Sequence, residues 1–215
     1  MRALHQGHGM TAALVCLASG SGRTIANFLD KIEEGSLDAR VARVICDREC
    51  SAIERLSARG VAAEVVPWTR GTPPEEYAGR VWPLIEEAAP DLVCLCGFLR
   101  LLAIPGAWRN RVMNIHPGRL PAFGGKGMYG ERVHAAVLEA GAALSGCTVH
   151  FADPQYDKGP IILQSSVPVL EGDTPGTLAA RVFEQECVIY PQAVSLFAAG
   201  RLRVEGKQVE IVDPQ

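Results

Sequence analysis

The segment ALVCLASGSGRT, residues 13–24, is the clearest indication of fold class in this chain of 215 residues. Its first seven residues form an unbroken run of apolar and small side chains, as in a strand that is covered on both faces. Two glycines follow, and from residue 24 to 34 apolar side chains recur at helical spacing until Gly35. A buried strand that turns through glycines into a helix is typical of the first strand–helix unit of a parallel sheet.

The same alternation continues along the chain. We expect strands at residues 41–46, 61–66, 92–98 and 112–116, with helices at 51–58 and 74–89 between them. After a loop rich in glycine and proline we expect a helix at 129–140, strands at 147–151 and 161–169, a helix at 174–199 and a hairpin at 202–212. The sequence therefore predicts an α/β, Rossmann-like fold with a mostly parallel central sheet, helices on both faces, a long C-terminal helix and a hairpin. We interpret residues 1–11 as a disordered leader and 12–215 as a single domain.

Composition excludes several classes of protein. A net charge of -3 and a pI near 6.0 offer no large basic face for nucleic acid. No apolar window is long enough to cross a membrane, and the first ten residues lack the apolar run of a signal peptide. The seven cysteines are odd in number and lie mostly in apolar runs, which is typical of buried free thiols in a reducing cytosol. We expect a cytoplasmic protein with small-molecule partners, no nucleic acid and no membrane; its oligomeric state stays open.

The loop Gly20-Ser21-Gly22-Arg23-Thr24 joins the first predicted strand to the first predicted helix. Glycines let the backbone approach a ligand, and a helix N-terminus presents free N–H groups and a partial positive charge, so an anion such as phosphate fits there. A plain tight turn is the alternative, and Arg23 favours phosphate because a guanidinium can bind it with two hydrogen bonds. The third glycine of a dinucleotide fingerprint is replaced by Ile25, which argues against a nicotinamide cofactor and against Asp47 as a ribose-binding acid.

A second candidate site follows the predicted strand at 112–116. Asn114 and His116 point to the same face because side chains alternate along a strand, and they lie at the carboxyl end, where open α/β sheets bind ligands. An amide N–H and an imidazole can stabilise an oxyanion and move a proton, as acyl transfer to an amine requires. The alternative is a histidine that caps the core.

Three further residues complete the list of titratable candidates. Asp157 precedes a predicted strand, and a carboxylate near His116 would raise the imidazole pKa; the alternative is an ordinary turn residue. His150, on the predicted strand at 147–151, could face the same pocket and support the pair. His134 lies on a helix, where we expect surface or core packing.

Taken in order, these motifs resemble the phosphoribosylglycinamide formyltransferases from about residue 13 to 203. The motifs are Ser19-Gly20-Ser21-Gly22, Gly97-Phe98-Leu99-Arg100-Leu101-Leu102, Asn114-Ile115-His116-Pro117, Gly146-Cys147-Thr148-Val149-His150-Phe151, Asp157-Lys158-Gly159-Pro160 and Gln185-Glu186. The Asn-x-His-Pro motif with the later Asp-x-Gly is specific for folate-dependent formyl transferases as a group, and the chain length and the last helix indicate the glycinamide branch.

The resemblance implies an enzyme of purine biosynthesis. It would transfer the formyl group of 10-formyltetrahydrofolate, its co-substrate, to the amine of 5'-phosphoribosylglycinamide without a metal. The implied residues are catalytic Asn114, His116 and Asp157; phosphate- and ribose-binding Gly20, Ser21, Gly22, Arg23, Thr24 and Glu186; and folate-binding Leu99, Arg100, Leu101, Leu102, Asn114, Asp153 and Asp157. The pterin would lie against the backbone of the segment 99–102.

Three departures from the family pattern lie on the acceptor side. Arg23-Thr24 stands where Ser-Asn is common, Gly118-Arg119 stands where Ser-Leu is common, and the loop 123–130 is longer and richer in glycine. The alternative functions are a 10-formyltetrahydrofolate hydrolase, which normally carries an extra N-terminal domain, and a formyl transferase for another small amine. A transfer-RNA formyltransferase would need a further C-terminal domain and a basic surface. A catalytically silent nucleotide-binding module has no use for the amide, imidazole and carboxylate together.

Overall fold

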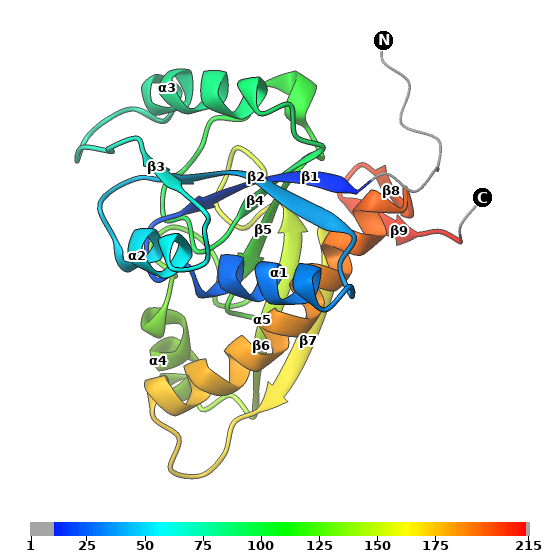
Figure 1. Ribbon diagram of the computed structural model, residues 1–215. Helices are drawn as coiled ribbons and strands as arrows, with labels where there is room; N and C mark the ends of the chain where they lie inside the picture. Colours follow the sequence, from blue (N-terminus) through cyan, green and yellow to red (C-terminus); the bar gives the residue numbers. More distant parts are fainter. Residues whose placement is uncertain (1–10, 214–215) are drawn as a thin grey trace.

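The computed structural model describes residues 11–213 and has the predicted alternation of strands and helices (Figure 1). The strands are β1 (Ala12–Ala18), β2 (Ala39–Cys46), β3 (Ala63–Val65), β4 (Leu92–Leu95), β5 (Val112–His116), β6 (Leu144–Phe151), β7 (Ile161–Pro168), β8 (Leu202–Glu205) and β9 (Gln208–Ile211). The helices are α1 (Arg23–Glu33), α2 (Ser51–Ser57), α3 (Pro74–Glu87), α4 (Glu131–Glu139) and α5 (Pro175–Ala198), with a short 3-10 turn at Gly106–Trp108. The leader expected at residues 1–11 lies outside the described residues except for Thr11.

Seven strands form the central sheet in the order β3-β2-β1-β4-β5-β6-β7. Strands β1 to β5 are parallel, while β6 is antiparallel to both β5 and β7, so the prediction of a mostly parallel sheet is confirmed. The strand order reverses between β1 and β4, so the carboxyl ends of β1, β4 and β5 meet at one edge where such sheets bind ligands.

The decisive first strand is buried on both faces, as its apolar run predicts. Leu14 and Cys16 belong to one hydrophobic cluster, which includes side chains of α1, α2, α4 and α5. Val15 and Leu17 belong to a second cluster on the opposite face, where α3 packs. Helices thus cover both faces of the sheet, and α3 lies on its own side (Figure 1).

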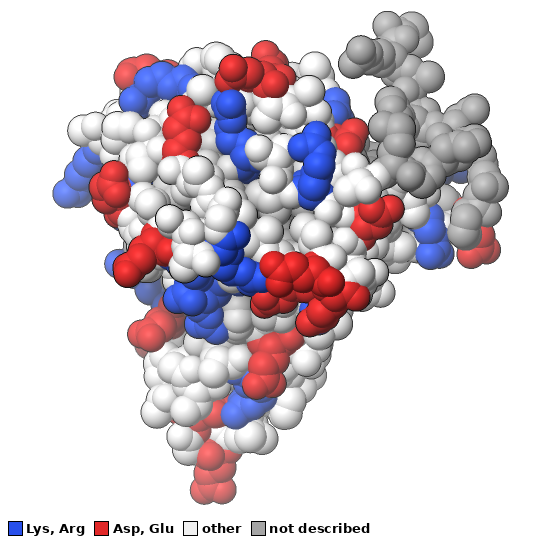
Figure 2. Space-filling view, viewed as in Figure 1, with Lys and Arg blue, Asp and Glu red and all other residues white. Residues whose placement is uncertain are grey.

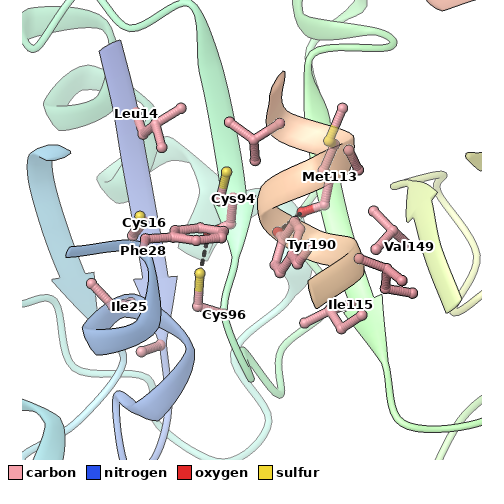
Figure 3. Packing of buried hydrophobic residues seen from close by; sticks show 14 of the residues in the cluster. Leu14, Cys16, Ile25, Phe28, Cys94, Cys96, Met113, Ile115, Val149 and Tyr190 are labelled. Carbon is pink, nitrogen blue, oxygen red and sulfur yellow. Dashed lines mark hydrogen bonds between the residues drawn. The ribbon is translucent and has the colours of Figure 1, made fainter. Parts of the chain in front are cut away.

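Tyr190 of α5 anchors the long helix to the middle of the sheet (Figure 3). Its ring is fully buried edge-on against Phe28, and its hydroxyl lies 3.0 Å from the carbonyl of Met113 and 3.3 Å from that of Leu95. Burial raises the pKa of Tyr190, so the phenol stays a hydrogen-bond donor. This contact fixes α5 against β4 and β5, the two strands that lead into the candidate site.

Of the boundaries that differ from the prediction, two have a clear physical reason. The apolar run at 92–98 ends as a strand at Leu95, because Gly97 takes a left-handed backbone conformation (φ 72°) that turns the chain across the end of the sheet. Strand β6 begins three residues before the predicted Cys147, at the exposed Leu144, because its pairing with β7 reaches as far as Pro168. Helix α5 is capped at its N-terminus, where the Thr174 hydroxyl accepts the N–H of Thr177.

The seven cysteines are free thiols, five of them buried. The face seen in Figure 2 carries acidic and basic side chains interspersed, without a large area of one sign. Of the helices in the described part of the chain, none combines the length and the apolar character that crossing a membrane requires.

Candidate active site

The fold brings the three predicted residues of the second site together. Asn114 and His116 lie in the last three residues of β5, and Asp157 lies in the loop between β6 and β7. His116 Nδ1 lies 3.5 Å from Asp157 Oδ2. The imidazole is buried, while Asn114 and Asp157 are partly exposed. The grouping of an amide, an imidazole and a carboxylate is therefore a feature of the structure, and their catalytic roles remain a prediction.

The backbone of the glycine-rich loop completes the surroundings of this group. His116 Nε2 lies 2.8 Å from the carbonyl oxygen of Phe123, which can only accept, so this nitrogen carries a proton. The N–H of Gly125 donates to Asp157 Oδ2 at 2.8 Å. Residues 123–125 thus contact both partners of the His116–Asp157 pair and hold them in one orientation.

Opposing effects set the protonation of the pair. Burial lowers the pKa of His116, and the negative charge of Asp157 acts in the other direction without cancelling it. Burial acts to raise the pKa of Asp157, but the nearby imidazoles of His150 and His116 and the Gly125 N–H outweigh it and lower that pKa. Asp157 is therefore a carboxylate at neutral pH, and it makes a proton on His116 less costly.

The Asp-x-Gly motif has a steric explanation. Asp157 adopts a left-handed backbone conformation (φ 56°), which turns its carboxylate back toward β5 and β6. A Cβ at Gly159 would collide with the carbonyl oxygen of Phe151, so the loop can return to the sheet only with glycine at that position. Glycine also fits best at position 118, where a Cβ would lie 2.9 Å from His116 Nε2. A serine at this position, as the family commonly carries, would require the side chains of His116 and Val133 to shift.

His150 lies in the site, as the strand alternation allowed. It is buried in β6, its Nε2 lies 3.1 Å from Asn114 Nδ2, and the same nitrogen lies 3.5 Å from Asp157 Oδ1. His134 is buried in α4 and belongs to the core-packing alternative expected for it. Neighbouring Thr148 donates to the carbonyl of Gly118 at 2.7 Å, which fixes the chain just beyond His116.

The phosphate-site candidate lies at the carboxyl end of β1. Gly22 is the N-terminal cap residue of α1 with φ 68°, and a Cβ there would lie 2.8 Å from Ala52 Cβ, so glycine is required. The first bond inside the helix runs from Ala26 N–H to the Gly22 carbonyl, which leaves the preceding N–H groups of the first turn without a helical partner. These donors and the helix dipole make the loop suitable for an anion.

Arg23 and Glu186 meet beside this loop. The Arg23 guanidinium lies 3.7 Å from the centre of the Phe183 ring, and Phe183 and Glu186 are on the same helix, α5. Burial raises the pKa of Glu186 to about 7, and the charge of Arg23 opposes that rise. The structure thus joins the two parts of the predicted phosphate and ribose site, the loop and Glu186.

The segment predicted to bind the pterin crosses the end of the sheet after β4. The Leu99 N–H donates to the Ser19 hydroxyl at 2.9 Å, and Leu102 is buried in the core. The Arg100 guanidinium stacks on Trp68 and donates to the carboxylate of Asp47 at 2.6 Å. Side chains therefore hold this segment in place, and its backbone is the part left for a ligand.

Asp47 is fully buried as an internal ion-pair partner. Besides Arg100, it accepts from Arg48 at 3.2 and 3.1 Å. Burial acts to raise the pKa of Asp47, and the hydrogen bonds from Arg48, Arg100 and Ser19 lower it. A carboxylate occupied in this way has no free oxygen for a ribose, in agreement with the argument from the missing third glycine. Asp153 accepts the N–H of Gln155 and shapes the loop before Asp157.

Comparison with known proteins gives one consistent result. The family described as formyl transferase matches residues 12–194. A phosphoribosylglycinamide formyltransferase from Arabidopsis thaliana, labelled chloroplastic, is 34% identical over 194 residues, which are 88% of this chain and 66% of that protein. The chain therefore spans slightly less than two thirds of the length of that relative. The phosphoribosylglycinamide formyltransferase of Escherichia coli (strain K12) is 34% identical over 194 residues, 89% of each chain.

Solved structures agree with the sequence relatives. Glycinamide ribonucleotide transformylase 1 from Symbiobacterium toebii superposes with a TM-score of 0.88 at 40% identity, over 99% of both chains. The compared region covers nearly the whole of both chains and so includes the loops that form the candidate site.

Proposed function

This chain belongs to the formyl transferase family, and on that premise we propose that it transfers the formyl group of 10-formyltetrahydrofolate to the amine of phosphoribosylglycinamide. The observation that carries the proposal is the grouping of Asn114, His116 and Asp157 at the carboxyl end of β5. Phosphoribosylglycinamide as the acceptor is supported by the names of the relatives from Arabidopsis thaliana and Escherichia coli and of the Symbiobacterium toebii structure. We further propose that residues 12–215 form one domain that works in the cytoplasm on de novo purine synthesis.

In the proposed reaction the acceptor amine attacks the formyl carbon and a new carbon–nitrogen bond forms. The carbonyl oxygen becomes an oxyanion, which the Asn114 amide N–H and the protonated imidazole of His116 stabilise. Asp157 favours that protonated form of His116. The amine loses a proton, the bond between the formyl carbon and folate N10 breaks, and N10 takes up a proton as tetrahydrofolate leaves.

The acceptor would bind at the loop Gly20–Thr24. The free N–H groups of the first turn of α1 and the Arg23 guanidinium suit its phosphate, and Glu186 suits its ribose hydroxyls. The formyl-folate would lie against the backbone of residues 99–102 and against Asp153 and Asp157.

The experiment follows folate absorbance after purified protein is mixed with 10-formyltetrahydrofolate or its 5,8-dideaza analogue. The proposal predicts deformylation only when phosphoribosylglycinamide is present. Equal deformylation without any amine would favour the hydrolase, the second candidate, which shares the Asn, His and Asp group. Deformylation that requires a different amine would support formyl-folate as the donor and contradict phosphoribosylglycinamide as the acceptor.

A further inference from the structure

His150 and Asn114 lie directly opposite each other on neighbouring antiparallel strands. They are paired residues in the register of β5 and β6, and His150 is only 2% exposed. A residue pair at such positions faces the same side of the sheet at close range. The side chain of His150 is thus placed by the sheet itself, behind the Asn114 amide and away from solvent.

The hydrogen bonds of His150 define its tautomer. Its Nδ1 lies 2.8 Å from the carbonyl oxygen of Phe151, which can only accept, so Nδ1 carries the proton. In the neutral ring Nε2 is then a lone-pair acceptor, and the atom of Asn114 that faces it at 3.1 Å must be the Nδ2 donor. The opposite amide orientation would set the Asn114 carbonyl oxygen against that lone pair.

We propose that His150 is a positioning residue that fixes the orientation of the Asn114 amide during formyl transfer. One N–H of Asn114 donates to His150, so the other N–H is directed to the open carboxyl end of β5, where an oxyanion would form. A freely rotating amide would present its oxygen to that anion part of the time. The inference rests on the proposed function and adds a residue that holds the oxyanion donor in place.

Asp157 is the charged group that faces His150, and His116 approaches it through the same carboxylate. Asp157, from the loop after β6, lies 3.5 Å from Nε2, and His116 of β5 faces the other oxygen of the same carboxylate. A proton on Nε2 would leave Asn114 Nδ2 facing another donor and force its amide to turn over. The proton on Nδ1, fixed by the Phe151 carbonyl, therefore keeps Nε2 as the acceptor for Asn114, and Asp157 pairs with His116.

The kinetic test compares two substitutions of similar size. His150→Gln keeps a carbonyl oxygen that can accept from Asn114, and His150→Leu removes the acceptor. We expect His150→Leu to lower kcat by about 10- to 100-fold, below the loss from removing an oxyanion donor outright, with the acceptor KM nearly unchanged. His150→Gln should stay within about threefold of wild type. In an Asn114→Ala background, His150→Leu should cause no further loss, because both changes act on the same group. Equal losses for Gln and Leu, or losses that multiply with Asn114→Ala, would overturn the proposal.

A second measurement does not depend on turnover or on the folding of a His150 variant. In protein labelled with 15N-histidine, nitrogen NMR should show a protonated Nδ1 and an unprotonated, hydrogen-bonded Nε2 for His150. Asn114→Ala should move the Nε2 resonance toward that of a free lone pair. A protonated Nε2, or a resonance that ignores Asn114→Ala, would contradict the positioning role. If the wild-type protein showed no formyl transfer, that result would count against the proposed function alone. The nitrogen spectrum of His150 would still test its hydrogen bond to Asn114.

Discussion

His116 Nδ1 lies 3.5 Å from Asp157 Oδ2, while its other ring nitrogen is 2.8 Å from the carbonyl of Phe123. Both neighbours of this imidazole are acceptors, so the environment suits a ring that carries two protons. Burial lowers the pKa of His116 nonetheless. The balance between burial and the Asp157 charge thus decides how readily the ring becomes an imidazolium.

Asp157→Asn should shift that balance. With the carboxylate gone, the pKa of His116 should fall below its value in the wild-type protein, because burial then acts without a compensating charge. Turnover at neutral pH should fall by about 10²- to 10⁴-fold, the range for loss of a group involved in proton transfer. Proton NMR titration of His116 and steady-state kinetics measure the two effects. An unchanged pKa of His116 would show that the charge of Asp157 does not influence the imidazole.

Arg23→Ala should weaken acceptor binding and spare the donor. Removal of a charge-assisted hydrogen bond costs about 1.5–3 kcal/mol, which is about a 10- to 150-fold rise in the KM for phosphoribosylglycinamide. The KM for formyl-folate should stay the same. Arg40→Ala is the matched control, because Arg40 is exposed at the opposite end of β2. A rise in the KM for formyl-folate instead would mean that Arg23 contributes to the folate site and would contradict its role in binding the acceptor phosphate.

Gly124→Ala should disturb the site without unfolding the protein. An added Cβ would collide with Leu120 Cδ2, which is buried, and lie 3.3 Å from Asp157 Cβ, so we expect the loop that contacts His116 and Asp157 to shift. We expect at least a tenfold loss of kcat with an unchanged melting midpoint, since residue 124 is in a surface loop. The control Gly79→Ala lies in α3, where a Cβ meets nothing within 4 Å. Wild-type kcat in Gly124→Ala would show that the loop position is not critical.

Asp47→Asn should test the buried ion pairs that hold the pterin segment. Because the hydrogen bonds from Arg48 and Arg100 lower the pKa of Asp47, the carboxylate stabilises the fold above its ordinary pKa of 3.8. That contribution is lost as pH falls through the lowered pKa. Substitution should therefore cost about 2 kcal/mol of unfolding free energy at neutral pH, reduced from a fully buried pair because both arginines are partly exposed.

Chemical denaturation at several pH values measures this cost. The difference between Asp47→Asn and wild type should shrink as the solution becomes more acidic than pH 3.8. Asp38→Asn, at an exposed position just before β2, should match wild type throughout. A difference that is constant with pH would mean that packing, rather than charge, explains the effect.

Much of the fold could be predicted from the sequence, because the buried strands are apolar runs and the helices have apolar side chains at helical spacing. The direction of β6 could not, since a strand that follows a long loop has the same pattern in either direction. The end of β4 was also missed, because Cys96 and Phe98 are buried without belonging to a strand.

The candidate site divides in the same way. Asn114, His116 and Asp157 are visible as motifs, whereas the bond between Asn114 and His150 depends on the register of β5 and β6, which a single sequence does not specify. The stacking of Arg23 on Phe183 joins residues 160 positions apart and has no local signal. Long-range pairing of this kind requires the folded chain.

Carbon NMR can follow the transferred formyl carbon itself and so distinguish transfer to the amine from hydrolysis. Formyl-folate labelled with 13C at the formyl group is mixed with the enzyme and phosphoribosylglycinamide, and carbon NMR identifies the labelled product. We expect a labelled formamide on the acceptor, produced by wild-type protein and at least 100-fold more slowly by Asn114→Ala and His116→Ala. Labelled formate released at the same rate with or without the acceptor would contradict it, because water would then be the nucleophile at this site.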